Sequence, residues 1–440
     1  TGFHYRHQWV GEGSISRRWN YVGTTALPAS NDVVMSDTVE TGRRLPVWEA
    51  ADIIRSRQPI TPALWQEDAY YFESNKYIAE RAVIENVAAG YFQAQGKFSD
   101  TGLLGRTGFL AGVRFEDTRT ESVGYVRARI ASSTALRLSN PAEAARQDYA
   151  GTRRELDGGY RKSFPSVHLT QDLAANWKAR LSWSTSFGRP PLNNLLPNET
   201  INETAQTLTV NNPSLLPQTA RNWDASLEYY FEPAGNLTVG WFHKTIRDFI
   251  VSGISSGTIG TARDNGYEGE YGGFTRLSSA NAGTAYVQGW EISYLQQFTF
   301  LPGLLKGLGA SINVTALDAH GDYGGRGRRE GRDVEGFVPR VGNVSVFWRH
   351  RGFSSRVIIN HTGESITEFT QGQPARSRYL SPRTVINAGI GYQFRPEVTF
   401  SLDVSNLTNS PQSAYRGVPD RLQFKLFGGT TVTAGINGRF

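Results

Sequence analysis

The sequence contains no cysteine, a single methionine and no long apolar run, and each absence restricts what the protein can be. Without cysteine, the chain has neither disulfides nor thiolate metal sites. No stretch of about 18 consecutive apolar residues occurs, so a membrane-spanning helix is excluded. If this chain enters a membrane, it must do so through strands that form a barrel.

The chain also lacks a start methionine and a signal peptide, so we expect a mature or truncated polypeptide. Its seven histidines show no metal-ligand spacing, and neither a metal nor another cofactor is expected. The formal net charge of +6 is modest over 440 residues and indicates no nucleic-acid partner. With 39% hydrophobic residues and 47 glycines, the composition is that of a folding chain rather than a disordered one.

Apolar and polar residues alternate most clearly near the C-terminus. Val398, Phe400, Leu402 and Val404 share one face, and the residues between them are polar. A period of two indicates a strand with one apolar and one polar face. The chain ends on the aromatic residue Phe440. Apolar residues toward lipid, polar residues toward a lumen and an aromatic residue at the interface are typical of a transmembrane β-barrel.

The same alternation recurs along the chain and predicts about fourteen strands. They are expected near residues 1–10, 82–97, 108–118, 160–172, 177–187, 220–231, 236–249, 285–300, 308–317, 338–349, 353–362, 383–394, 397–405 and 422–440. Residues 11–79 read mostly as irregular loop that can contain local hairpins. Because soluble sandwiches also alternate, this pattern alone does not identify a membrane protein.

The connections between these strands alternate in length. Short connections are expected near 99–106, 173–176, 232–235, 301–307, 350–352 and 395–396, and long ones near 119–159, 188–219, 250–284, 318–337, 363–382 and 406–421. Short turns at one end and long loops at the other are typical of outer-membrane barrels. A soluble sandwich has no reason to produce this asymmetry repeatedly.

Aromatic residues gather at the short-turn end of the predicted strands. They are Phe98, Trp177, Phe231, Phe298, Phe300, Phe353, Phe394 and Phe440. Rings at a fixed depth form a girdle at the membrane interface. A general preference of aromatic residues for strands would place rings in mid-strand too, as it does for Trp183 and Trp241.

Two long loops carry candidate ligand-binding side chains. These are Tyr267 and Tyr271 in the loop 250–284, and Tyr323, Arg326, Arg328, Arg329 and Arg332 in the segment 322–333. Guanidinium and phenol groups at the mouth of a barrel suit an anionic or sugar-like ligand. The alternatives are a solvated loop without a ligand and a contact with nucleic acid. The second is disfavoured because the glycine–arginine tract occurs once and is flanked by acids.

One segment matches a catalytic pattern without its context. Gly253-Ile254-Ser255-Ser256-Gly257 has the spacing of a nucleophile elbow, which requires a strand before it and a helix after it. The segment lies in a predicted long loop with no helix following. No convergent acid and base pair is evident either, so we expect neither catalytic residues nor an enzyme.

Several short motifs, taken together, resemble those of TonB-dependent outer-membrane receptors. They are Gly112-Val113-Arg114-Phe115-Glu116, Ser186-Phe187-Gly188-Arg189-Pro190, Asn222-Trp223-Asp224, Gly289-Trp290-Glu291-Ile292 and Asn406-Leu407-Thr408-Asn409 with the terminal Phe440. No single motif identifies the family, but the order and spacing of the motifs together are specific to it. The resemblance covers residues 80 to 440.

The resemblance implies an all-β fold, an antiparallel transmembrane β-barrel of about 22 strands around a plug. About fourteen strands are expected here, with neither a plug domain nor an energy-coupling box, so the barrel is expected to be partial. We divide the chain into residues 1–79, a barrel strand with a long extracellular loop region, and residues 80–440, the C-terminal barrel strands.

The resemblance also implies a function. Such a receptor takes up a scarce nutrient, such as an iron–siderophore complex, cobalamin or an oligosaccharide, across the bacterial outer membrane. Its expected partners are outer-membrane lipid, that small-molecule or oligosaccharide ligand, and the TonB energy-coupling complex acting through the missing N-terminal region. It is expected to be a monomer. The alternatives are a passive porin-like barrel and a soluble secreted β-protein or surface enzyme.

Overall fold

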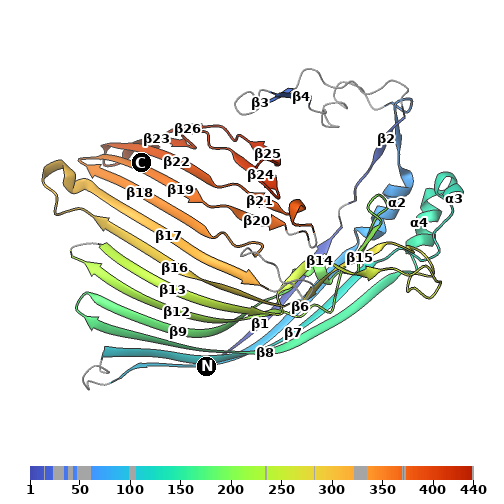
Figure 1. Cartoon of the computed structure of the whole chain (residues 1–440), viewed down its shortest axis with the longest axis horizontal. Coiled ribbons are helices and arrows are strands. Elements are labelled where there is room, and N and C mark those ends of the chain that lie inside the picture. The colour runs from blue at the N-terminus through green and yellow to red at the C-terminus, as the bar shows by residue number, and fades with distance from the viewer. Residues whose placement is uncertain are drawn as a thin grey trace.

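The computed structural model describes residues 1–13, 15–22, 34–37, 43–46, 61–98, 106–232, 235–281, 283–321, 334–368, 370 and 373–438. Its main body is one antiparallel sheet of fourteen strands that curves into a wide trough (Figure 1). In sheet order these are β1 (Gly2–Glu12), β6 (Arg81–Lys97), β7 (Thr107–Tyr125), β8 (Arg153–Ala174), β9 (Trp177–Gly188), β12 (Gln218–Phe231), β13 (Gly235–Arg247), β16 (Thr284–Gln297), β17 (Leu308–Gly321), β18 (Arg340–His350), β19 (Phe353–Thr362), β22 (Arg383–Arg395), β23 (Val398–Ser405) and β26 (Thr431–Gly438). The predicted strand number is confirmed.

The strand register separates an apolar convex face from a polar concave face. In β23 and β26, Phe400 lies opposite Ile436 on the convex side, and Asp403 lies opposite Thr433 on the concave side. Ile436 is 75% exposed and Trp290, on β16, is 56% exposed. Large apolar side chains exposed in such numbers require an apolar surrounding, which lipid supplies.

No helix in the described part of the chain is long and apolar enough to cross a membrane.

The predicted girdle of rings is present at the short-turn end of the sheet. Ring centroids lie 4.7 Å apart for Trp177 and Tyr229, and 4.3 Å apart for Phe353 and Tyr392. Phe394, on the same face, is 67% exposed. The terminal residue Phe440 lies outside the described residues.

One predicted strand is wrong. Residues 422–440 do not form a single strand, because the chain turns at Gly428 and Gly429, where Gly429 has a φ of +79°. Before this turn, β25 (Leu422–Leu426) pairs with β24 (Gln412–Arg416) in a separate small sheet. Only β26, after the turn, joins the main sheet.

The long loops are more ordered than the sequence indicates. One small sheet runs β10 (Glu199–Asn202), β11 (Thr207–Val210), β15 (Thr275–Asn281), β14 (Ile250–Thr258), and another runs β20 (Ser365–Glu368), β21 (Arg378–Leu380), β24, β25. The region 11–79, predicted as mostly loop, contains the pairs β2 (Trp19–Tyr21) with β5 (Trp65–Glu67) and β3 (Val34–Asp37) with β4 (Arg43–Pro46).

Helices also occur in these loops. They are α2 (Ala69–Ile78), α3 (Thr134–Ser139) and α4 (Pro141–Tyr149), with 3₁₀ turns η2 (Leu192–Leu195), η3 (Gly303–Gly307) and η4 (Pro374–Arg376). Asp68 caps α2 by accepting a hydrogen bond from the Tyr71 N–H at 2.8 Å. Asn140 caps α4 in the same way, and Pro141 is its first residue.

The main sheet is open. Among the described residues, β1 pairs with β6 alone and β26 pairs with β23 alone, so these two strands are its edges. An edge strand presents unpaired backbone groups, which lipid cannot satisfy.

Candidate functional site

Tyr267 and Tyr271, two of the predicted ligand-binding residues, lie in the connection between β14 and β15. Their rings meet edge to face with centroids 5.7 Å apart. Tyr267 is only 9% exposed and packs with Leu208 and Ile259 in a small apolar cluster. These tyrosines therefore contribute to the packing of the loops, and their role toward a ligand remains a prediction.

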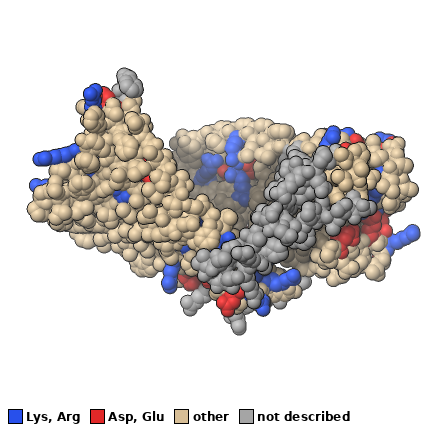
Figure 2. Space-filling model, turned by 90° about the horizontal axis from the view of Figure 1, so that it is seen from above, with Lys and Arg blue, Asp and Glu red and all other residues tan. Residues whose placement is uncertain are grey.

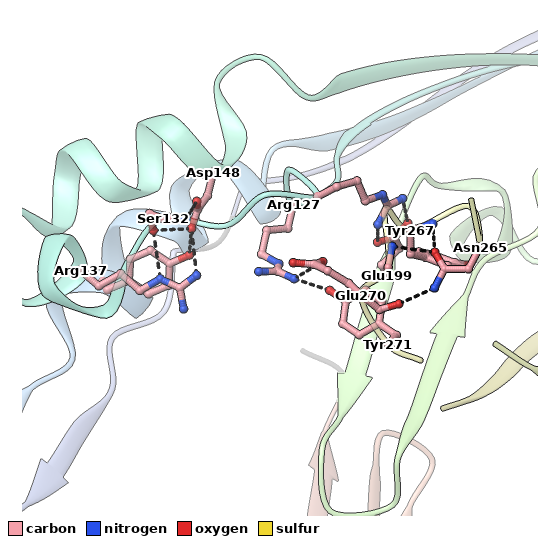
Figure 3. A network of polar contacts seen from close by, with 12 residues as sticks. Arg127, Ser132, Arg137, Asp148, Glu199, Asn265, Tyr267, Glu270 and Tyr271 are labelled. Carbon is pink, nitrogen blue, oxygen red and sulfur yellow. Dashed lines mark hydrogen bonds and ion pairs between the residues drawn. The ribbon is translucent and has the colours of Figure 1, made fainter. Parts of the chain in front are cut away.

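Two arginines from the loop after β7 hold this segment in place (Figure 3). Arg129 forms a bidentate ion pair with Glu199, with both N–O distances at 2.6 Å, and its guanidinium lies 4.8 Å from the Tyr267 ring centroid. Arg127 donates to Glu270 at 2.8 Å and to the hydroxyl of Tyr271. These contacts join three separate loops of the barrel mouth.

The electrostatics of this cluster follow from burial and pairing. Burial disfavours the charged form of Arg127, but the Tyr271 hydrogen bond and the Glu270 charge keep its pKa above the ordinary value. The hydrogen bond to Glu199 raises the pKa of Arg129. Burial raises the pKa of the Tyr271 hydroxyl, so this group stays neutral. Both arginines therefore stay charged throughout the neutral pH range.

A second cluster connects the helices α2, α3 and α4. The buried carboxylate of Asp148 accepts hydrogen bonds from the Ser132 N–H at 2.6 Å and from the hydroxyls of Ser132 and Tyr70, and pairs with Arg137 at 3.3 Å. Burial raises the pKa of the adjacent Tyr149 to about 12. The α2 region is thereby fixed to the loop that follows β7.

The remaining predicted residues, Tyr323, Arg326, Arg328, Arg329 and Arg332, lie outside the described residues. Their proposed role toward an anionic ligand stays a prediction.

The concave wall carries a polar groove that the sequence reasoning did not single out. It encloses about 470 Å³ and is lined by residues of β9, β12, β13, β16 and β17, among them Ser182, Asp224, Ser226, Thr238, Gly240, Glu291, Ser293, Asn313 and Thr315. Gly240 leaves room in its centre, because no side chain fills the wall there. The polar positions of the alternating strands were the available signal, but sequence alone does not show which strands face each other.

Several charges on the concave wall are paired across neighbouring strands. Arg180 on β9 contacts Glu228 on β12 at 2.6 Å, and the hydroxyl of Tyr230 donates to Glu228 at 2.6 Å. Arg356 on β19 contacts Asp403 on β23 at 2.9 Å. Figure 2 shows Lys and Arg side chains inside the hollow of the trough. The wall can therefore contact charged or polar solutes.

Nearer the loops, two buried carboxylates anchor the segment after β9 to the wall. Glu85 on β6 and Glu116 on β7 are 3% and 5% exposed. Arg189 lies 3.3 Å from Glu85 and also pairs with Glu116, while Arg114 pairs with Glu116 at 3.0 Å. Arg6 on β1 also pairs with Glu85. Three arginines share these two carboxylates, and each carboxylate pairs with two of them, which suits a structural anchor.

Neither a metal centre nor a nucleophile elbow is formed by the described residues. They contain no group of three or more His, Cys, Asp or Glu side chains that could hold a metal ion. The Gly253–Gly257 pattern lies on β14, a strand within the loop, and turns rather than a helix follow it. The arrangement offers polar contacts and no catalytic constellation.

The curved antiparallel sheet, apolar outside and polar inside, with short turns at one end, defines the class of transmembrane β-barrel proteins. The sequence model of the family described as TonB dependent receptor-like, beta-barrel matches residues 5–407. The chain therefore belongs to the TonB-dependent receptor family, whose members are outer-membrane transport receptors of Gram-negative bacteria and not enzymes. The predicted family, the all-β transmembrane barrel fold and the outer-membrane location are confirmed.

Solved structures share this fold at low sequence identity. The ferric-catecholate import receptor Fiu from K12 E. coli is 14% identical, with a TM-score of 0.56, over 82% of this chain and 46% of that one. The siderophore receptor PiuA from Acinetobacter baumannii is 14% identical (TM-score 0.53; 81% and 44% covered), and the copper transporter OprC is 12% identical (TM-score 0.53; 88% and 50% covered). The chain thus spans half or less of these receptors. No curated protein matches it.

Proposed function

We propose that this protein is an energy-coupled uptake receptor that binds a scarce nutrient at its long loops and passes it along the concave wall. The observation that carries the proposal is the polar groove of about 470 Å³ on that wall, whose charged lining residues are Arg180, Asp224 and Glu291. A polar interior suits passage of a hydrated solute through a barrel, whereas an apolar interior does not.

Among the candidate nutrients we favour an iron–siderophore complex over cobalamin or an oligosaccharide. The support is that Fiu is a ferric-catecholate import receptor and PiuA a siderophore receptor. The predicted arginine loop, with Arg326, Arg328, Arg329 and Arg332, would supply guanidinium groups to an anionic complex.

Energy coupling is part of the same proposal. Transport would require the TonB complex acting on a plug and a coupling segment of the whole receptor, as the family implies. The relevant test compares uptake of ⁵⁵Fe-labelled siderophores in cells with and without TonB. Uptake that needs both this protein and TonB supports the receptor. Ion conductance in planar bilayers without any energy source would instead support a passive porin.

The arginine loop can be tested in the same cells. Replacing Arg326, Arg328, Arg329 and Arg332 with glutamine should weaken uptake of an anionic ferric siderophore while leaving the level of the protein in the outer membrane unchanged. A neutral ferric siderophore is the matched control, because its recognition does not depend on guanidinium charge. Unchanged uptake of the anionic complex would remove the loop from the site.

A further inference from the structure

A groove of about 510 Å³ lies on the convex, lipid-facing side of the sheet across β1, β6, β7 and β8, which run together at the base of the trough in Figure 1. The register places Gly90 of β6 directly between Phe3 of β1 and Phe115 of β7. Phe3 and Phe115 are 73% and 60% exposed. No atom lies within 4 Å of where a Cβ of Gly90 would be, so the floor between the two rings is open.

Two arginines stand at the long-loop end of this groove. The next row of the register aligns Ala88 of β6 with Asp117 of β7, and Asp117 with Arg161 of β8. Asp117 lies 2.7 Å from Arg161 and 3.8 Å from Arg119. The arginine side chains are 80% and 74% exposed. Both arginines contact Asp117 through Nε, so this one carboxylate serves two guanidinium groups.

The depth of this charge in the membrane follows from the strand geometry. The ring centroids of Phe109, on β7, and Phe98 lie 5.6 Å apart in the short-turn girdle. Asp117 follows Phe109 eight positions later on the same strand. At about 3.3 Å per residue and a tilt of about 40°, Asp117 lies about 20 Å above the girdle. Because the apolar band of a barrel is about 25 Å tall, the two arginines reach the opposite lipid–water boundary.

We propose that this groove binds one phosphorylated lipid of the leaflet on the long-loop side, with an acyl chain between Phe3 and Phe115 and its phosphate on Arg119 and Arg161. Three features favour this occupant over an unspecific lipid contact. The slot has the width left by a missing side chain, its walls are apolar rings, and guanidinium groups bind phosphate oxygens through paired hydrogen bonds. The charge lies where a lipid phosphate lies.

The test measures binding of phosphatidic acid to the purified protein in detergent by native mass spectrometry. Replacing both Arg119 and Arg161 with glutamine removes the charge, and Gly90→Leu fills the slot. Each variant should weaken binding by about tenfold, which corresponds to about 1.4 kcal/mol. The matched controls are Arg221→Gln and Gly342→Leu, which alter convex-face residues on β12 and β18 away from the groove. Both should bind like the unaltered protein.

Two further probes test whether binding needs both the acyl chains and the phosphate of the lipid. Diacylglycerol, which lacks the phosphate, should bind the unaltered protein about tenfold more weakly than phosphatidic acid. Inorganic phosphate in millimolar excess should not displace the lipid. The proposal is overturned if the groove variants bind as well as the controls, or if inorganic phosphate competes. Because the groove lies on the opposite face from the proposed transport path, either proposal can fail without the other.

Discussion

At the scale of single residues, the loops at the barrel mouth depend on buried ion pairs. The side chains of Arg129 and Glu199 are 15% and 9% exposed, so neither partner can be removed without leaving the other charge poorly solvated. A surface pair such as Arg146 with Glu143 on α4 is 64% and 42% exposed and contributes little. Removing the arginine from each pair therefore compares a buried ion pair with an exposed one.

Replacing Arg129 with methionine should therefore lower the stability of the loop sheet by about 2 kcal/mol, because Glu199 loses two charge-assisted hydrogen bonds. Hydrogen exchange of the β10 and β11 amides measures this as faster opening. The control Arg146→Met, which removes an exposed pair, should leave this exchange unchanged. Equal effects of the two substitutions would show that the Arg129 contact contributes no more than a surface pair.

The cap of α2 gives a prediction on pH. Burial opposes ionisation of Asp68, but its hydrogen bonds to Arg18 and to the Tyr71 N–H hold its pKa below the ordinary value of 3.8. A lowered pKa in the folded state contributes stability above the unfolded-state value, and this stability is lost as the pH falls through the folded value. The first turn of α2 should therefore loosen below pH 3.8.

A spin label can measure this loosening, since the chain has no cysteine of its own and Ala69→Cys gives a single attachment site in the first turn of α2. Label mobility should rise as the pH falls below 3.8. Asp68→Asn keeps a capping side chain but cannot titrate, so its label mobility should not depend on pH in this range. The same transition in both proteins would assign it to another group.

At the scale of elements, the groove on the concave wall depends on a glycine in the middle of β13. A Cβ at Gly240 would lie 3.8 Å from the nearest heavy atom, the backbone oxygen of Glu291, which is an ordinary contact. A larger side chain can therefore enter the groove without displacing the backbone. A substitution at Gly240 can therefore narrow the groove without destabilising β13.

Gly240→Trp should reduce nutrient uptake by about tenfold, because the indole occupies the path, while thermal stability stays unchanged. The measurement is the initial rate of ⁵⁵Fe-siderophore uptake at equal amounts of protein in the outer membrane. Gly342→Trp, on the convex face of β18, is the control and should transport normally. Normal uptake by Gly240→Trp would exclude the groove from the transport path.

At the scale of the whole molecule, the sheet separates two solvents. Val314 and Asn313 are neighbours on β17, but Val314 faces lipid and Asn313 faces the lumen with the polar groove. Any charge introduced at these two positions lies at nearly the same membrane depth. Only the face differs, so the pair reports directly on which side is lipid.

Val314→Arg should lower the free energy of unfolding by about 2–4 kcal/mol, because a guanidinium on the lipid face near mid-membrane is poorly solvated. Asn313→Arg should cost less than about 1 kcal/mol, since the lumen contains water. Urea unfolding in lipid vesicles measures both values. A similar cost at the two positions would contradict the assignment of the faces.

The sequence by itself determined the strands, their two faces and the asymmetry of short turns and long loops. These properties depend on neighbouring residues, as with Phe400 and Asp403, whose order along the chain fixes their faces. The split at Gly429 was missed because the pairing of β25 with β24, and not its own pattern, decides where that strand belongs.

Only the tertiary structure decided which distant side chains meet. Arg127 and Glu270 are 143 residues apart, and no local pattern indicates their contact at 2.8 Å. The groove at Gly240 and the lipid groove at Gly90 likewise exist because four or five neighbouring strands align in one register. Alternation specifies faces within a strand, whereas register and loop packing arise only when the sheet is assembled.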